Sequence, residues 1–212
     1  MIGIYDYTVI LTYLSVASTV TGTFIAFHGY NPIWAVLCLM FSGLCDSFDG
    51  KIARTKKKRS AKAASFGIQI DSLADLISYG ILPVAIGYSI GMDKWYYLPV
   101  AFIFVLAALI RLAHFNVNEE EIKAKGKKKA ISFIGLPTTS VCLILPIIYA
   151  FRSLSEGFFP VVWAGALLVI AALFVIKLEF VDKPDMKKLI RWIILGIIEL
   201  TIIIGITLWL TR

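Results

Sequence analysis

The sequence predicts an all-α integral membrane protein, because it is too hydrophobic for a soluble domain and its apolar residues fall in long runs. Of its 212 residues, 59% are hydrophobic, and the mean hydropathy is +0.84. A soluble domain of this length could not bury so much apolar surface. Apolar runs of roughly 20 residues have the length that a helix needs to cross the hydrocarbon core of a bilayer.

Seven such runs follow one another along the chain. In order, they cover about 5–28, 32–51, 67–91, 96–115, 133–153, 158–178 and 189–210. The first run has no basic segment before it, so it is predicted to span the membrane and not to be a cleaved signal peptide. The third is the least regular, because it begins among acidic residues. The polar stretch 116–130 is predicted to be a solvated loop, since a block of glutamates is followed there by lysines.

Basic residues predict the orientation of these spans. All but three of the 21 Lys and Arg residues lie in three stretches, 51–62, 111–129 and 177–191. These stretches alternate with the other connections, so all three can lie on one side of the membrane, which the positive-inside rule makes the cytoplasmic side. The N-terminus would then start inside and the C-terminus of a seven-span chain would end outside. A nucleic-acid-binding function is not expected, because the charges flank membrane spans and no recognition fold accompanies them.

Four aspartates lie within the predicted second and third spans, where acids are costly and usually face a protein interior or a wet cavity. Asp46 and Asp49 are three residues apart, and Asp71 and Asp75 are four apart, so each pair shares one face of its helix. Gly67 stands one turn before Asp71 on the same face. Because the two spans are antiparallel neighbours, both pairs are expected at one depth near the cytoplasmic side.

Carboxylates gathered in this way suit a hard divalent cation. Four close carboxylates repel one another, and one or two cations would relieve that repulsion. An all-oxygen donor set favours Mg²⁺ or Mn²⁺ over Zn²⁺, and clusters of this kind commonly serve phosphoryl chemistry. Gly50 and Ala53 in the second span and Gly67 in the third would let a bulky group approach the backbone, and Arg54 offers donors to a phosphate.

The acids belong to a longer pattern. It reads Asp46-x2-Asp49-Gly50-x2-Ala53-Arg54, followed by Gly67-x3-Asp71-x3-Asp75. This pattern resembles the signature of the CDP-alcohol phosphotransferases, with every signature residue present. The stretch between Arg54 and Gly67 is longer than the family usually has, and loops absorb such extra length at little cost. In the first span, where the family has an asparagine, this sequence offers Ser15.

Within that family, three stretches resemble the phosphatidylserine synthases: "IDSLADLISYGILP" (70–83), "IRLAHFNV" (110–117) and "FIGLP" (133–137). The resemblance implies a six-helix catalytic core over residues 1–180. Residues 181–212 would add a basic cytoplasmic linker and one additional C-terminal transmembrane helix.

The resemblance also implies roles for individual residues. Metal ligands would be Asp46, Asp49, Asp71 and Asp75, with Asp75 also the catalytic base. Nucleotide and phosphate would be bound by Asp46, Gly50, Ala53, Arg54 and Gly67. Ser78, which lies one turn after Asp75, and Arg111 are candidates for binding the acceptor.

The implied reaction is transfer of the phosphatidyl group from CDP-diacylglycerol to L-serine, with release of CMP. Its implied cofactors are two ions of Mg²⁺ or Mn²⁺. A homodimer in the cell membrane, with its active site at the cytoplasmic face, is also implied. The sequence leaves two alternatives open. The acceptor could be glycerol 3-phosphate or inositol phosphate, or the acids could belong to a cation transporter, although no broken-helix repeat of a transporter is visible.

Overall fold

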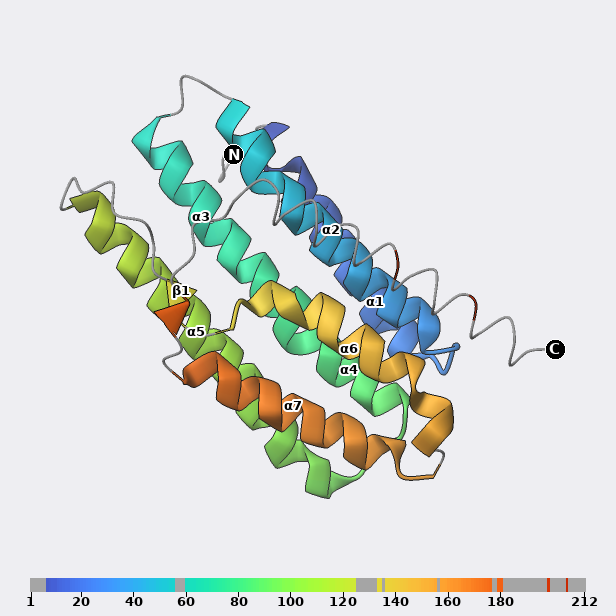
Figure 1. The fold of residues 1–212 in the computed structure, drawn as a ribbon. Coiled ribbons are helices and arrows are strands. Elements are labelled where there is room, and N and C mark those ends of the chain that lie inside the picture. Colours follow the sequence, from blue (N-terminus) through green and yellow to red (C-terminus); the bar gives the residue numbers. More distant parts are fainter. Residues whose placement is uncertain are drawn as a thin grey trace.

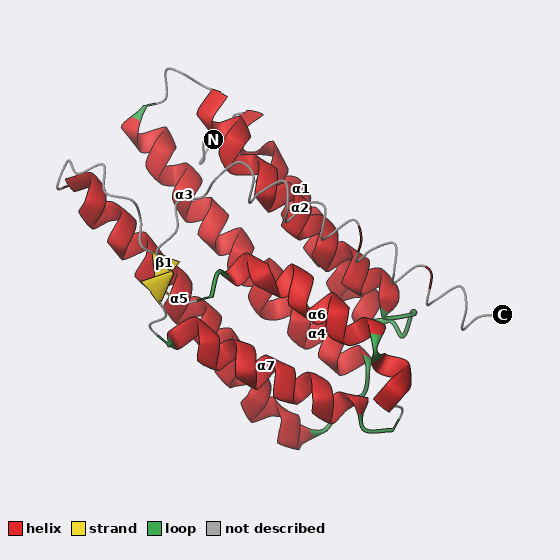
Figure 2. Ribbon diagram, viewed as in Figure 1, coloured by secondary structure: helices red, strands yellow, loops and turns green. Residues whose placement is uncertain are grey.

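The computed structural model describes residues 7–55, 60–124, 133–134, 136–155, 157–176 and 179–180, together with Ile198 and Gly205. Within these residues the fold is a bundle of helices that run roughly along one axis, with one short strand pair at its side (Figures 1 and 2). The predicted seventh span, at 189–210, and the predicted basic linker before it lie almost entirely outside the described residues.

In the described part of the chain, seven α-helices make up most of the bundle. They are α1 (Ile10–Phe27), α2 (Ile33–Thr55), α3 (Ala61–Asp75), α4 (Leu82–Ser89), α5 (Leu98–Ala124), α6 (Val141–Ala150) and α7 (Phe159–Val175). Short 3₁₀ turns adjoin them at η1 (Tyr7–Val9), η3 (Trp95–Tyr97), η4 (Thr138–Ser140) and η5 (Arg152–Ser155). The strands β1 (Phe133–Ile134) and β2 (Glu179–Phe180) pair in antiparallel fashion, which brings the segment before α6 next to the segment after α7.

The structure confirms the prediction of an all-α, multi-pass membrane protein. Among the described residues, four helical stretches are long and apolar enough to cross a bilayer, namely Ile10–Phe27, Ile33–Gly50, Lys62–Ser89 and Trp95–Glu121. Two shorter apolar helical stretches, Thr138–Ala150 and Phe159–Val175, pack among them. Large apolar side chains such as Leu98 and Phe102 are about two-thirds exposed on the outside of the bundle, at 70% and 66%. Such surface suits contact with lipid.

Several boundaries differ from the sequence prediction. The third span was expected from residue 67, but α3 already starts at Ala61. The fifth span was expected from residue 133, but 133–134 form a strand and the helical stretch starts only at Thr138. Pro137 explains this delay, because it is extended, with φ −59° and ψ 140°, and caps the helical stretch that follows. The expected loop at 116–130 is helical in its first part, since α5 continues to Ala124. Glu, Lys and Ala are good helix formers, which accounts for the extension beyond the apolar segment.

α1 packs against α2 through a stripe of small and polar residues. The buried residues of α1 recur three or four positions apart, and they are Thr12, Ser15, Thr19, Gly22 and Ala26. This spacing puts them on one helix face. Small residues let helix backbones approach closely within a membrane, where apolar side chains gain little from leaving lipid. A Cβ atom at Gly22 would lie only 2.8 Å from the Cβ of Cys38 on α2, so the approach is close.

The third span is one continuous helical path from α3 through a π-helical segment, η2 (Leu76–Ile81), into α4. At its end the amide of Leu82 donates to the carbonyl oxygen of Ile77, five residues earlier. Pro83 follows directly, and a proline within a helical path has no N–H to donate to the preceding turn. The widened turn thus lies where proline disturbs the regular α-helical pattern. The carbonyl oxygen of Pro83 accepts a hydrogen bond from Trp163 Nε1 of α7, at 3.1 Å.

The contact between α2 and α6 gives a testable prediction about packing. A Cβ atom at Gly43 would lie 2.2 Å from Sγ and 2.8 Å from Cβ of Cys142 on α6. Gly43→Ala is therefore expected to force the two helices apart and to lower the stability by about 1–3 kcal/mol, the usual cost of overpacking. The measurement is the thermal unfolding midpoint of the purified protein in detergent.

Gly165→Ala is the matched control, because Gly165 lies within α7 and a Cβ atom there would meet nothing within 4 Å. Alanine is the better helix former, so this variant should unfold at the same temperature as the wild type or slightly higher. Equal midpoints for the two variants would contradict the close contact between Gly43 and Cys142.

Candidate active site

The four aspartates predicted from the sequence come from two neighbouring parts of the bundle. Asp46 and Asp49 lie on α2, and Asp71 and Asp75 lie at the end of α3. One carboxylate oxygen from each of Asp46, Asp49 and Asp71 can be chosen so that the three atoms lie within 4.8 Å of one another. We refer to these three residues as the acid cluster. The structure therefore brings acids from both predicted pairs together.

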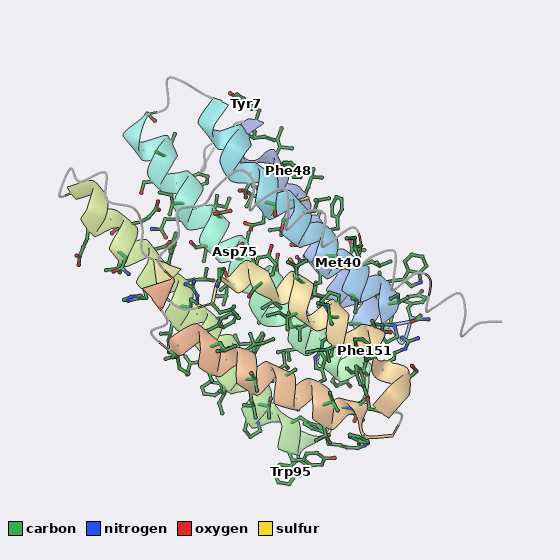
Figure 3. The ribbon with its side chains drawn as sticks, in the orientation of Figure 1. Tyr7, Met40, Phe48, Asp75, Trp95 and Phe151 are labelled. Carbon is green, nitrogen blue, oxygen red and sulfur yellow. The ribbon has the colours of Figure 1, made fainter. Side chains whose placement is uncertain are left out.

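Asp75 adjoins the acid cluster without belonging to it. It follows Asp71 by one helical turn and marks the end of α3, just before the π-helical segment. Figure 3 shows it in the interior of the bundle, at the level where α6 begins. It interacts electrostatically with all three members of the cluster. Its place beside the cluster is compatible with either of its predicted roles, as a further ligand or as a base.

Local helix geometry explains why these side chains converge. The spacing of three residues on α2 and four on α3 keeps each pair on one helix face. Both faces turn toward the bundle interior, and Asp49 is only 8% exposed. α3 begins cleanly at Ala61 because the side chain of Ser60 accepts a hydrogen bond from the amide of Ala63, at 3.1 Å. α2 ends at Thr55 and α3 begins at Ala61, so only a short connection joins these two antiparallel helices.

The acid cluster fits a hard divalent cation. Its donors are all carboxylate oxygens, which Mg²⁺ and Mn²⁺ prefer, and it contains no thiolate or imidazole that would favour Zn²⁺. Three negative charges at this separation in a partly buried place repel one another strongly. A bound cation would remove most of that repulsion, so the donor set suits a site for a divalent metal.

The other predicted signature residues flank the acids. Gly50 follows Asp49 directly and is exposed, and Gly67 lies one turn before Asp71 and is partly buried. Neither position carries a side chain that would block the approach of a ligand. Ala53 and Arg54 lie on the last turns of α2, but their side chains are outside the part of the chain that the structure describes.

Ser78, predicted to bind the acceptor, lies in a buried cluster of hydroxyls from three helical segments. We call its members the hydroxyl cluster, and they are Ser15 and Thr19 of α1, Ser42 of α2 and Ser78 of η2. All four side chains are at most 5% exposed. The Oγ atoms of Ser15 and Ser42 are hydrogen-bonded, and Oγ1 of Thr19 lies 2.7 Å from Oγ of Ser78. This cluster ties the π-helical segment to α1 and α2 just beyond Asp75.

Arg111, the other predicted acceptor-binding residue, is also buried, with 8% exposure. Its Nε donates a hydrogen bond to the carbonyl oxygen of Leu136, on the segment that leads into α6. On the same helix, Asn116 accepts a hydrogen bond from Ser72 at 2.9 Å. Because Ser72 is the neighbour of Asp71, this second contact holds α5 against the helix that carries the acids.

The sequence prediction did not include the hydroxyl cluster, the pair of Ser72 and Asn116, or the π-helical segment. The sequence does contain an indication of the hydroxyl cluster. Ser15 and Thr19 share the small-residue stripe of α1, and Ser42 precedes Asp46 by one turn. Serine and threonine on a helix face within a membrane often make hydrogen bonds between helices. Which partners they would find depends on how the helices are set against one another.

Comparison with known proteins shows to which family this chain is similar. The family description CDP-alcohol phosphatidyltransferase matches residues 8–211. A CDP-diacylglycerol–serine O-phosphatidyltransferase of Saccharomyces cerevisiae is 37% identical over 114 residues, which is 52% of this chain and 40% of the yeast protein. A protein of the same name from Bacillus subtilis is 30% identical over 164 residues, covering 75% of this chain and 80% of the relative.

An archaeal protein is also similar to this chain. An archaetidylserine synthase of Methanothermobacter thermautotrophicus is 28% identical over 173 residues, which is 81% of this chain and 64% of the relative. The chain therefore spans less than two thirds of the length of the yeast and archaeal relatives.

Proposed function

Because this chain belongs to the CDP-alcohol phosphatidyltransferase family, we propose that it transfers the phosphatidyl group from CDP-diacylglycerol to the hydroxyl of L-serine, giving phosphatidylserine and CMP. The observation that carries this proposal is the convergence of Asp46, Asp49 and Asp71 within 4.8 Å, at the spacing of the family signature. The names of the yeast, bacterial and archaeal relatives agree on a serine phospholipid as the product and thereby support serine as the acceptor.

In the proposed reaction, the serine hydroxyl oxygen attacks the phosphorus that carries diacylglycerol. A new P–O bond forms to serine, the P–O bond to the phosphate of CMP breaks, and CMP leaves with the bonding electron pair. The hydroxyl proton passes to a carboxylate, for which Asp75 is the candidate. Asp75 stands beside the acid cluster and so could reach an alcohol that approaches a phosphate held there.

We propose that Asp46, Asp49 and Asp71 hold Mg²⁺ or Mn²⁺, with two ions when Asp75 also contributes. A divalent ion at such a site neutralises the pyrophosphate and stabilises the charge on the departing CMP. The residues of this chain contribute the position of that charge. They keep the carboxylates on two facing helices, so the pyrophosphate would be held at one place relative to Asp75.

The neighbouring signature residues complete the proposed donor site. Gly50 and Gly67, which present no side chain, would let the nucleotide approach the helices that carry the acids, together with Ala53 and Asp46. Arg54 is proposed to bind phosphate, since a guanidinium offers a fork of donors to an anion.

We propose that Arg111 orients the acceptor serine. Its Nε donates to the carbonyl oxygen of Leu136, on the segment leading into α6. Asn116, on the same helix as Arg111, accepts a hydrogen bond from Ser72, the neighbour of Asp71. Ser78 would act on the acceptor side from within the hydroxyl cluster, where it lies one turn beyond Asp75.

We propose that the active site faces the cytoplasm, because the stretches 51–62 and 111–129, around the ends of α2 and α5, carry most of the Lys and Arg residues. A homodimer is proposed from the resemblance to the family. Chemical crosslinking of the purified protein in lipid nanodiscs would test the second point, and a monomeric mass would refute it.

Two other functions are compatible with parts of the site. The same chemistry could use glycerol 3-phosphate or inositol phosphate as the acceptor, and these phosphorylated acceptors would need more basic residues at the site. A cation transporter could use the acids, but the acids cluster with the signature glycines toward one end of the bundle. A transport function would also not explain the match to the family.

The test of the proposed function is CMP release by the purified protein, supplied with CDP-diacylglycerol and Mn²⁺ or Mg²⁺. Serine, glycerol 3-phosphate and inositol phosphate are compared as acceptors, and an assay without acceptor is the control. Release with serine alone is the expected result. Release with another acceptor would retain the chemistry and change the acceptor, whereas the absence of release with every acceptor would refute the proposal.

A further inference from the structure

Tyr79 stands out among the described residues because its buried hydroxyl has no hydrogen-bond partner. The side chain is 0% exposed, and its hydroxyl oxygen is the one buried side-chain nitrogen or oxygen in the described part of the chain that lacks a partner. Tyr79 belongs to the π-helical segment and follows Asp75 by four residues. A buried polar group without a partner is costly, and structures seldom retain one without a reason. Widened helical turns of this kind are frequent at functional sites.

The neighbouring hydroxyls do not supply a hydrogen-bond partner for Tyr79, because they form hydrogen bonds with one another. The hydroxyl of Thr19 donates to the carbonyl oxygen of Ser15 at 2.9 Å, so the contact between Thr19 and Ser78 requires Ser78 to donate. Ser15 and Ser42 share a further hydrogen bond. Ser42 lies beside the phenol of Tyr79 and interacts with it, but the two hydroxyls do not meet the geometry of a hydrogen bond.

The phenol hydroxyl lies next to the acid cluster. A Cβ atom added to Gly43 would be 3.8 Å from the Tyr79 hydroxyl oxygen, and Gly43 precedes Asp46 by one turn of α2. Asp46 and Asp75 both interact electrostatically with the phenol. The hydroxyl is therefore one turn further from the connection between α2 and α3 than the acids are, on the side of the site that faces the bundle interior.

We propose that the Tyr79 hydroxyl is a substrate-binding group, which donates a hydrogen bond to an anionic oxygen of the molecule bound at the acid cluster. This inference rests on the proposed function. Two parts of the proposed substrates supply such an oxygen, namely the transferred phosphate of the CDP-lipid and the carboxylate of serine. A phenol is a suitable donor at this place, because it can approach an anion without adding a positive charge that would compete with a cation for the carboxylates.

The test compares Tyr79→Phe with the wild type, since this change removes only the hydroxyl. Both proteins are purified at full length in lipid nanodiscs. The dissociation constants for Mn²⁺ alone and for CDP-diacylglycerol in the presence of Mn²⁺ are measured by intrinsic tryptophan fluorescence, and the KM for serine is measured by CMP release. If the phenol binds phosphate, the dissociation constant of CDP-diacylglycerol should rise about tenfold, and if it binds the serine carboxylate, the KM for serine should rise by about that factor.

Thermal unfolding without ligands separates a binding role from a structural one. The hydroxyl has no partner in the free protein, so Tyr79→Phe should leave the unfolding midpoint unchanged or raise it. Tyr149→Phe is the matched control, because Tyr149 is 2% exposed and its hydroxyl accepts a hydrogen bond from Arg152. This control should lower the midpoint and leave both substrate constants unchanged.

Three results would overturn the inference. The first is unchanged constants for CDP-diacylglycerol and serine, and the second is a change in Mn²⁺ affinity alone, which would mean that the phenol supports a carboxylate and not the substrate. The third is a marked loss of stability in ligand-free Tyr79→Phe, which would show that the hydroxyl has a partner within the protein. Failure of the wild type to bind CDP-diacylglycerol would overturn the proposed function and this inference together, and so it is distinct from the first three.

Discussion

Replacing Asp75 by asparagine is expected to lower the rate of CMP release by about 10²–10⁴-fold, the usual contribution of a positioned general base. Asparagine has nearly the same shape as aspartate but cannot accept the proton of the serine hydroxyl. Asp75 lies outside the group of three acids that meet within 4.8 Å, yet it interacts electrostatically with each of them. The loss should therefore appear in kcat, with a smaller change in the KM for serine.

The metal dependence of the same variant separates the two predicted roles of Asp75. If it acts as the base, the Mn²⁺ concentration for half-maximal CMP release should match that of the wild type. A higher concentration would assign Asp75 to the metal ligands instead. Asp93→Asn is the control, because Asp93 is an exposed aspartate that pairs with Lys94 at 3.3 Å, outside the acid cluster. Full activity in Asp75→Asn would refute both roles.

Asp49→Asn is expected to have the largest effect on metal binding. Asp49 is the most buried member of the acid cluster, at 8% exposure, and an amide oxygen is a weaker ligand for a hard cation than a carboxylate. We expect the affinity for Mn²⁺ to fall by at least about a hundredfold. CMP release should fall by about 10²–10³-fold even at high metal concentration, because charge on the departing phosphate is then less well stabilised.

Two measurements check this second prediction. Isothermal titration calorimetry gives the Mn²⁺ affinity, and thermal unfolding reports the link between metal and stability. The wild type should gain stability as metal is added, by about 2.7 kcal/mol at a hundredfold excess over the dissociation constant, whereas Asp49→Asn should gain much less at the same concentration. Without metal, the variant should be the more stable protein, since it carries one fewer of the mutually repelling charges.

The exposed Glu120 of α5 offers the control for charge alone. Glu120→Gln removes one negative charge from the same protein without touching the acid cluster, so its metal affinity and activity should equal those of the wild type. An unchanged Mn²⁺ affinity in Asp49→Asn would show that the cluster does not bind the catalytic metal, and the roles of Asp46 and Asp71 would need revision as well.

Local sequence determines how the acids are arranged within each pair. Asp46 and Asp49 must share a face, because three residues are nearly one helical turn, and the same holds for Asp71 and Asp75 at four. The meeting of the pairs follows from a short connection between two antiparallel helices. The sequence therefore predicted which acids converge, and the structure confirms this for Asp46, Asp49 and Asp71.

The class of this protein and the composition of its site follow from local patterns in the amino-acid sequence. The apolar runs predict membrane helices, because backbone groups within the bilayer need hydrogen bonds inside the protein and a helix forms all of them within one segment. The spacing of the aspartates and glycines required a shared acidic face. Both properties are carried by residues close together in the chain, and so they can be read without knowing how the helices pack.

Which side chains from different helices meet depends on how the helices pack in three dimensions. Ser15 and Thr19 contact Ser78, and Ser72 contacts Asn116. The hydroxyl of Tyr79 lies close to Gly43 of α2, one turn from Asp46, and has no hydrogen-bond partner. Each of these contacts depends on the crossing of two helices and on the widened turn before Pro83. Helix crossing is set by the packing of whole surfaces, with scatter of many degrees, so local spacing cannot specify it.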